Sequence, residues 1–254
     1  MESTDPTLQV AAVGPPDAPA PGANTRVAPI WHTVLLIVVL LAFSFAGASS
    51  QSRFTAGHGR AILYGSTVVW EWLLVGFVYV GIRKRTKLRD LIGGRWASVE
   101  DALLDIGLGV GLYVVLIAVI AGFAFSMGMM NEQTVSETRE KLGFIVPRNG
   151  FELVLFFLLS ATAGFCEEVI FRGYFQRQFA ALTNYVAAGI ALQALLFGAV
   201  HGYQGGKRMV IIAAEGVLFG VFAYWRRSLR PGMVAHFSQD ALAGAVALAH
   251  KLAR

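Results

Sequence analysis

The chain has 254 residues, of which 56% are hydrophobic and 15% are charged, whereas an ordinary soluble domain carries about 25% charged residues. This composition argues against a water-soluble globule and favours a polytopic membrane protein. The net charge of +5 does not form a basic surface interleaved with aromatic residues, so nucleic acid is not an expected partner. The single cysteine, Cys166, excludes an intramolecular disulfide framework and a cysteine-rich metal cluster.

The N-terminal segment differs in composition from the rest of the chain. Residues 1–29 contain six of the eight prolines and almost no large apolar side chains. Such a segment cannot bury enough apolar surface to offset the entropy lost on ordering, so we expect a disordered tail. Its one basic residue, Arg26, makes a poor start for a secretory signal.

Seven apolar stretches follow, each about long enough to cross a hydrocarbon core of about 30 Å as a helix that rises 1.5 Å per residue. We therefore predict an all-α fold, a polytopic membrane helical bundle with about seven transmembrane helices. The expected spans are 30–48, 61–82, 102–126, 149–180, 184–201, 209–225 and 232–249.

The expected spans form two groups separated by a polar interval. Residues 30–126 hold the first three spans, 127–150 form the expected connecting loop, and 151–250 hold the last four. Two helix starts carry the pattern of a capping box, because Ser98 and Asn149 are each followed three residues later by an acidic residue.

Lysine and arginine residues are concentrated in two links between spans. Residues 83–101 contain six of them, and residues 226–231 contain three. In a chain with seven spans both links fall on the same side of the membrane, and the positive-inside rule predicts that this side is cytoplasmic.

Two Gly-x-x-x-Gly spacings lie within predicted spans, Gly107 with Gly111 and Gly216 with Gly220. We expect them to mark close packing between helices rather than chemistry. The sequence has no internal repeat, which argues against an inverted-repeat transporter.

Several ionisable residues lie inside the apolar stretches. A charged side chain at that depth costs roughly 2.5 to 3.5 kcal/mol on insertion scales, so a chain that keeps several of them usually has a functional reason. These residues are Glu71, Glu167, Glu168, Arg172, His201, Glu215, His236 and Asp240.

The densest cluster of these residues runs from Cys166 to Arg172. Glu168 and Arg172 are four residues apart with the acid first, which is the favourable order for an ion pair on one helix face. Glu167 points about 100° away from Glu168, so one carboxylate would be neutralised and the other would be free to face something else. The alternative is that all three residues form a buried ion-pair network that only holds helices together.

Two histidines accompany this cluster. His201 lies four residues after Phe197, and His236 lies four residues before Asp240, so each pair shares a helix face. Together with Glu167, the two histidines can bind a divalent metal such as zinc, or can polarise a water molecule and a carbonyl group without one. A glutamate beside a polarised water is a natural general base.

The heights of these residues in the membrane can be compared. A turn near Thr183 joins two spans, with Glu167 16 residues before it and His201 18 residues after it. In an antiparallel pair the two residues therefore lie within about 3 Å of the same height. The position of His236 in its span matches this height less well. Either the turn extends beyond the bilayer, or a helix is interrupted near residues 202–206, and the sequence leaves both open.

Three elements occur in order, Glu-Glu-x-x-x-Arg from Glu167, Phe-x-x-x-His ending at His201, and His-x-x-x-Asp from His236. This order resembles the CPBP family, which includes the type II CAAX prenyl endopeptidases and the bacterial Abi or bacteriocin-processing proteins. The resemblance covers about 150–245.

The resemblance implies an intramembrane endopeptidase whose catalytic cavity lies within a helical bundle, in a membrane expected to be the bacterial inner membrane. The implied partners are the lipid bilayer and a peptide or membrane-protein substrate. Glu167 resembles the base that activates water, Glu168 and Arg172 its supporting ion pair, and His201 and His236 the metal ligands or electrophilic partners.

The implied cofactor is a divalent metal, expected to be zinc, with Glu167, His201, His236 and Asp240 as its ligands. Asp240 stands where better-studied members often have asparagine. An ionised aspartate only accepts hydrogen bonds, so this departure favours a metal ligand or a support for His236 over a donor to an oxyanion.

Two other classes of function compete with the protease. One is a catalytically inactive membrane scaffold or immunity protein, which would tolerate loss of the set Glu167, His201 and His236. The other is a small transporter in which Glu71, Glu215 and Asp240 relay protons, which internal symmetry would favour.

Overall fold

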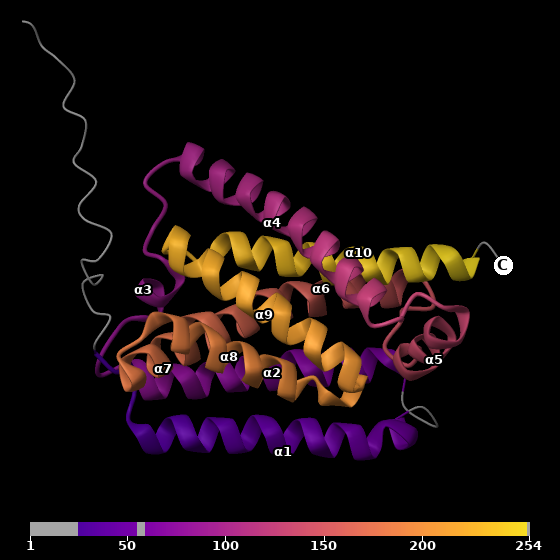
Figure 1. The fold of residues 1–254 in the computed structure, drawn as a ribbon, viewed down its shortest axis with the longest axis horizontal. Coiled ribbons are helices and arrows are strands. Elements are labelled where there is room, and N and C mark those ends of the chain that lie inside the picture. Colours follow the sequence, from indigo (N-terminus) through magenta and orange to yellow (C-terminus); the bar gives the residue numbers. More distant parts are fainter. Residues whose placement is uncertain (1–24, 55–58, 253–254) are drawn as a thin grey trace, which may run out of the picture.

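The computed structural model of the chain describes residues 25–54 and 59–252, and these residues form helices with no strand among them (Figure 1). The expected all-helical class is therefore confirmed. Most of the expected tail, residues 1–24, lies outside the described residues.

The helices, in chain order, follow the predicted spans closely. They are α1 (Ile30–Phe54), α2 (Arg60–Ile82), α3 (Leu88–Ile92), α4 (Val99–Ser126), α5 (Glu132–Leu142), α6 (Gly150–Glu167), the π-helix η1 (Glu168–Phe175), α7 (Gln176–Thr183), α8 (Val186–Val200), the 3₁₀-helix η2 (Gly202–Gln204), α9 (Gly206–Arg226) and α10 (Arg230–Leu252).

The two predicted capping residues begin their helices as expected. Ser98 accepts a hydrogen bond from the Asp101 amide at the start of α4, and Asn149 accepts one from the Glu152 amide at the start of α6. The interval expected as a connecting loop also contains a helix, α5, which Asn131 caps in the same way.

Each of the seven predicted spans is helical, and the helices run up and down between two ends of the bundle. Figure 1 shows α3 and α7 at one end and α5 and the C-terminus at the other. Within the described residues, four segments are long and apolar enough to cross a membrane by themselves: α2, α4, the continuous run from α6 to α7, and α9. α1 and α8 have shorter apolar stretches, and α10 carries more polar residues.

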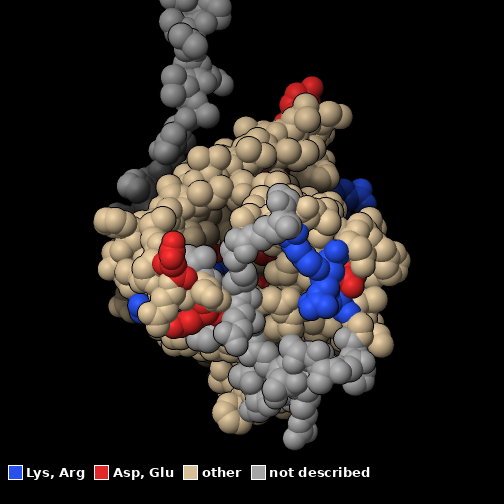
Figure 2. Space-filling view, turned by 90° about the vertical axis from the view of Figure 1, so that its right-hand side faces the viewer, with Lys and Arg blue, Asp and Glu red and all other residues tan. Residues whose placement is uncertain are grey.

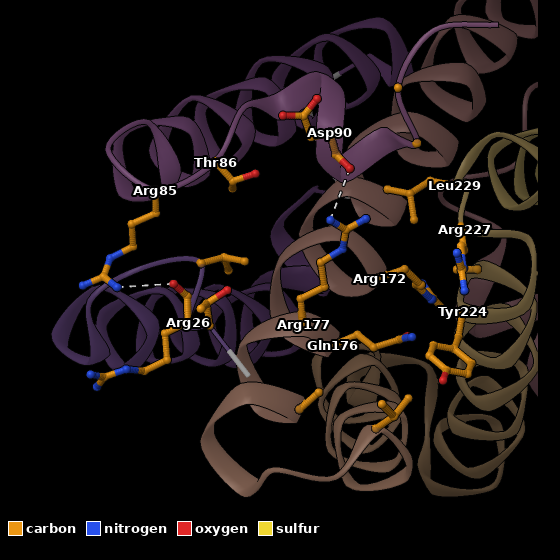
Figure 3. Close-up of a pocket in the computed structure, with 17 residues that line it drawn as sticks. Arg26, Arg85, Thr86, Asp90, Arg172, Gln176, Arg177, Tyr224, Arg227 and Leu229 are labelled. Carbon is orange, nitrogen blue, oxygen red and sulfur yellow. Dashed lines mark hydrogen bonds between the residues drawn. The ribbon is translucent and has the colours of Figure 1, made fainter. Parts of the chain in front are cut away.

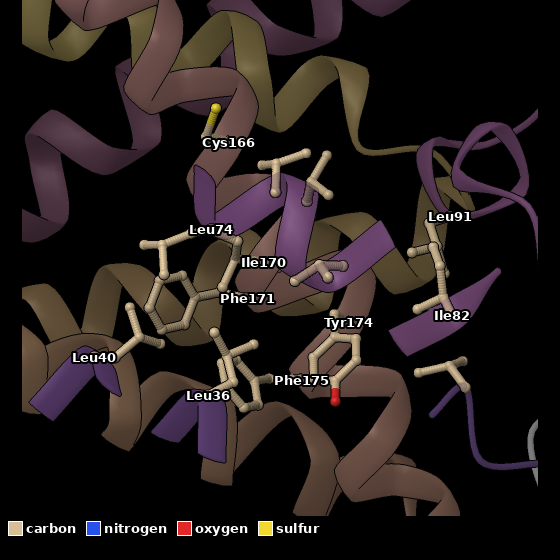
Figure 4. Packing of buried hydrophobic residues seen from close by; sticks show 14 of the residues in the cluster. Leu36, Leu40, Leu74, Ile82, Leu91, Cys166, Ile170, Phe171, Tyr174 and Phe175 are labelled. Carbon is tan, nitrogen blue, oxygen red and sulfur yellow. The ribbon is translucent and has the colours of Figure 1, made fainter. Parts of the chain in front are cut away.

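The continuous helix from α6 through η1 to α7 is the centre of the bundle. α2 and α10 pack against α6, and α8 packs against α7 and α9. All eight residues of η1 are buried. Phe171 and Phe175 of η1 meet Leu36 of α1 and Leu74 of α2 in the main apolar core (Figure 4). This packing fixes the rotation of η1 about its axis.

Only one of the two Gly-x-x-x-Gly pairs mediates close packing. A Cβ atom at Gly216 would lie 3.0 Å from the Ala194 Cα of α8, so that prediction is confirmed. The prediction for Gly107 and Gly111 is wrong, because both are exposed with open space beside them. Gly109 faces the bundle instead, where a Cβ would lie 2.8 Å from the Pro231 carbonyl oxygen, because residues two apart on a helix point in nearly opposite directions.

The two basic links lie together at the α3 end of the bundle. The Leu229 amide donates a hydrogen bond to the Ile92 carbonyl, and Arg230 donates one to the Gly94 carbonyl. We predict that this end is cytoplasmic.

Single cysteines at Lys87 and Arg227 test this orientation, because the native Cys166 is buried and cannot compete for the reagent. An impermeant thiol reagent should label both positions only after the cells are lysed. Strong labelling of both positions in intact cells would reverse the topology.

Candidate active site

The last residue of α6 and the first turn of η1 carry the acidic cluster. Glu168 Oε1 lies 2.9 Å from Arg172 Nη1, and both side chains are fully buried. A π-helix has a wider turn than an α-helix and is frequently found at functional sites. The predicted ion pair is therefore present, in a helix geometry that the sequence did not indicate.

Aromatic rings enclose the arginine of this pair. The Arg172 guanidinium carbon lies 4.3 Å from the centroid of the Phe197 ring and 4.8 Å from that of Phe219. Rings at these distances attract a cation through their quadrupole, and more strongly when water is excluded. The charge of Arg172 is thus held in place by Glu168 and by two rings from α8 and α9.

His236 of α10 faces three carboxylates. Its Nδ1 lies 3.5 Å from Glu168 Oε1, and its Nε2 lies 3.7 Å from both Glu167 Oε2 and Asp240 Oδ2. We call Glu167, Glu168, Arg172, His236 and Asp240 the His236 cluster. The structure therefore brings together five of the six predicted site residues.

A glycine allows α10 to approach this closely. A Cβ atom at Gly232, one turn before His236, would lie 2.8 Å from Glu168 Oε2. A larger residue at this position would push the helix away from the glutamate. Gly164 of α6 has a similar role, because its Cβ would lie 3.0 Å from the Met233 carbonyl oxygen.

The exposed fraction of the side chains increases across the cluster from Glu168 to Asp240. The Glu168 side chain is fully buried and His236 is 8% exposed, whereas Glu167 is 18% and Asp240 is 36% exposed. Figure 2 shows the end of the bundle opposite the basic links, which is hollowed near its centre with acidic atoms visible inside. A substrate would reach Glu167 and Asp240 before the ion pair.

His201, the sixth predicted residue, borders the cluster at the end of α8. Its Nδ1 is 2.8 Å from the Phe197 carbonyl oxygen, and its ring lies 4.8 Å from the Phe197 ring. Phe197 in turn lies 6.2 Å from the ring of His236. The helix is interrupted directly after His201, at η2, so the interruption that the sequence left open is present.

Two further acids noted in the sequence are also buried. The Glu71 carboxyl is close enough to Glu167, His236 and Asp240 to interact with them electrostatically. Glu215 accepts a hydrogen bond of 3.0 Å from the Gln239 side-chain amide. The region around Glu167 is therefore strongly acidic.

As the side chains stand, the donor atoms lie slightly farther apart than the ligand atoms of a bound zinc ion. Zinc ligand atoms lie about 2.0 to 2.1 Å from the metal, which places them roughly 3.4 Å from one another, whereas His236 Nε2 is 3.7 Å from each nearby oxygen. Across the described part of the chain, no three His, Cys, Asp or Glu side chains are arranged to hold a metal ion.

The sequence did not single out Asp105, a buried acid of α4. It accepts a hydrogen bond from Trp96 Nε1 at 2.9 Å and pairs with Arg226 at 2.9 Å and with Arg230 at 3.7 Å. These contacts tie α4 to the link between α9 and α10, away from the His236 cluster, so Asp105 supports the fold.

Comparison with known proteins points to the same part of the chain. Residues 149–242 match the family model described as type II CAAX prenyl endopeptidase Rce1-like. The match begins at the residue that caps α6 and ends two residues after Asp240, so it contains the whole His236 cluster and His201. No curated protein and no solved structure matches the chain.

Proposed function

Since residues 149–242 belong to the type II CAAX prenyl endopeptidase Rce1-like family, we propose that Glu167 and His236 hydrolyse a peptide bond of a membrane-associated substrate. The apolar helices and the family together make the chain an integral membrane protein with a CAAX-type endopeptidase core. The identity of the catalytic residues and of the substrate is what we propose.

One observation carries the assignment of the base. Glu167 Oε2 is buried, has no hydrogen-bond partner among the described residues, and faces His236 Nε2 across 3.7 Å. That distance is too long for a direct hydrogen bond and suits a bridging water molecule. A water held there would touch both a base and a positively polarised ring nitrogen.

The reaction then proceeds by general base catalysis. Glu167 takes a proton from the water, whose oxygen adds to the carbonyl carbon of the peptide bond. His236 donates a hydrogen bond from Nε2 to the oxyanion, while its Nδ1 faces Glu168. When the carbon–nitrogen bond breaks, Glu167 returns the proton to the leaving amine, so the carboxylate is regenerated.

The supporting residues keep this geometry. Glu168 holds the Nδ1 side of the His236 ring, and Arg172 neutralises Glu168, so that Glu167 remains the carboxylate facing the substrate. In this proposal Asp240 fixes the other edge of the ring from one helical turn away.

The proposed activity is tested on purified full-length protein in liposomes, with one CAAX peptide supplied in farnesylated and unmodified forms. We expect mass spectrometry to show cleavage of at least one form. A difference between the two rates would show whether the prenyl group is recognised. Binding of the peptides without cleavage of either would overturn hydrolysis in favour of a scaffold.

A metal-assisted form of the proposal makes a different prediction. If zinc is held by Glu167, His201, His236 and Asp240, the purified protein should contain one metal ion per chain, and His201→Ala should lose it. In the form without a metal, activity survives dialysis against a chelator. Metal analysis of the wild type beside His201→Ala decides between the two forms.

Asp240→Asn tests the positioning of His236. Asparagine keeps the size of the side chain but removes the charge 3.7 Å from Nε2. Loss of such a supporting carboxylate typically costs about 10- to 100-fold in activity, and we expect the loss to fall on kcat with KM little changed. Full activity of the variant at pH 8 would contradict this role.

A further inference from the structure

A second cavity opens at the basic end of the bundle, between α2, α3, α7 and the end of α9 (Figure 3). Its volume is about 840 Å³, within the range of cavities that hold small molecules. The ends of helices and the short segment before α1 line it, so it lies where the bundle would meet the lipid headgroups.

The lining of this basic cavity is strongly cationic. It includes five arginines, namely Arg26, Arg85, Arg172, Arg177 and Arg227, against one acidic residue, Asp90. Such an excess of one sign, in a cavity with low-dielectric walls, attracts ligands of the opposite charge.

Four of these arginines form no ion pair with a described acidic residue. Arg85 donates to the Arg26 carbonyl oxygen, and Arg177 donates to the Asp90 and Leu91 carbonyl oxygens, as Figure 3 shows in part. Carbonyl groups orient these guanidinium groups without neutralising them. For the Arg26 and Arg227 side chains, no hydrogen bond or ion pair occurs within the described residues.

One of the five arginines, Arg172, is buried. Arg172 is only 1% exposed, pairs with Glu168 and is among the residues that line the cavity. Its Nε, Nη1 and Nη2 atoms make no hydrogen bond of good geometry among the described residues. The Glu168 carboxylate neutralises the charge of Arg172, so the positive charge of the cavity comes from the other four arginines.

We propose that the basic cavity binds a phosphate group, and that the phosphate belongs to an anionic phospholipid of the surrounding membrane. Arginine guanidinium groups match the geometry of phosphate oxygens. Apolar side chains of Ala180, Val186 and Leu229 share the lining and suit the glycerol and upper acyl carbons. Anionic lipids are enriched in the cytoplasmic leaflet, the side predicted for this end.

Glu167, His236 and Asp240 are not among the residues that line the cavity, so this site does not depend on the proposed protease activity. A phosphate held in the cavity binds the folded protein and not the unfolded chain. The ligand is therefore expected to stabilise the folded bundle.

The test is a thermal-shift titration of full-length protein in neutral detergent with short-chain phosphatidylglycerol or phosphatidylcholine of equal chain length. Arg26→Gln with Arg227→Gln removes the two arginines whose side chains form no hydrogen bond or ion pair with another described residue. Lys87→Gln with Arg95→Gln removes the same charge at the same end of the bundle, outside the cavity lining, and serves as the matched control.

We expect the wild type and the control variant to bind phosphatidylglycerol in preference to phosphatidylcholine, and the Arg26/Arg227 variant to bind about 30-fold more weakly. This factor corresponds to about 2 kcal/mol, or roughly 1 kcal/mol for each arginine. Arg26→Lys with Arg227→Lys should restore part of the affinity, because it returns the charge without the planar fork.

Inorganic phosphate and glycerol 3-phosphate distinguish the source of the phosphate. If either binds as tightly as the lipid and is lost in the Arg26/Arg227 variant, the site is a phosphate site but takes a soluble ligand. An equal loss in the control variant, or no preference for phosphatidylglycerol, would overturn the proposal by showing only general attraction to a basic surface.

Discussion

Replacing Glu167 by glutamine is expected to abolish peptide hydrolysis while the protein remains folded. Glutamine has nearly the same size and shape but cannot accept the proton of the attacking water. General base catalysis typically contributes about 10² to 10⁴ in rate, so we expect kcat to fall at least about 100-fold with little change in KM. The measurement is steady-state cleavage of a peptide by the protein in liposomes.

Glu215→Gln is the matched control. Glu215 is another buried glutamate, on α9, and it accepts a hydrogen bond from Gln239 that a glutamine oxygen can also accept. The Glu215→Gln variant should cleave the peptide at a rate within a few-fold of the wild-type rate. If Glu167→Gln cleaved the peptide at the wild-type rate, another group would have to be the base, and Glu71 is the next candidate because it is buried nearby.

The fold class and the pairs within one helix were predictable from the sequence. Contacts between residues four apart follow from helix geometry alone, so Glu168 with Arg172 and His236 with Asp240 were expected and are present. The near-equal height of Glu167 and His201, counted from the turn near Thr183, stays a prediction.

The contacts between helices were not predictable in the same way. They depend on the rotation and crossing of neighbouring helices, which the packing of the whole bundle decides. The ring of Phe219 over Arg172 and the close approach allowed by Gly232 belong to this class. Apolar periodicity also does not distinguish an α-helix from a buried π-helix, so η1 was not expected.

The role of Asp105 is a second feature that could not be predicted from the sequence. It lies in the second turn of α4, four residues after Asp101, and nothing near it in the sequence marks it as a partner for a distant residue. Only the position of Arg226 and Arg230, more than a hundred residues later in the chain, makes Asp105 a buried partner.

Removing one member of the Glu168–Arg172 pair is expected to destabilise the protein more than any other single change in the cluster. Both side chains are fully buried at 2.9 Å, and loss of one partner leaves an uncompensated charge in a medium of low dielectric at a cost of roughly 3 to 5 kcal/mol. Glu168→Gln and Arg172→Met should each lower the midpoint of thermal unfolding in detergent and the yield of folded protein.

The double variant Glu168→Gln with Arg172→Met separates the pair from its individual members. It leaves no unpaired charge, so its loss of stability should be smaller than the sum of the two single losses. Methionine also keeps apolar contact with the rings of Phe197 and Phe219. If both single variants melted at the wild-type temperature but lost activity, the pair would act in the reaction itself rather than by holding Glu168 and His236 in place.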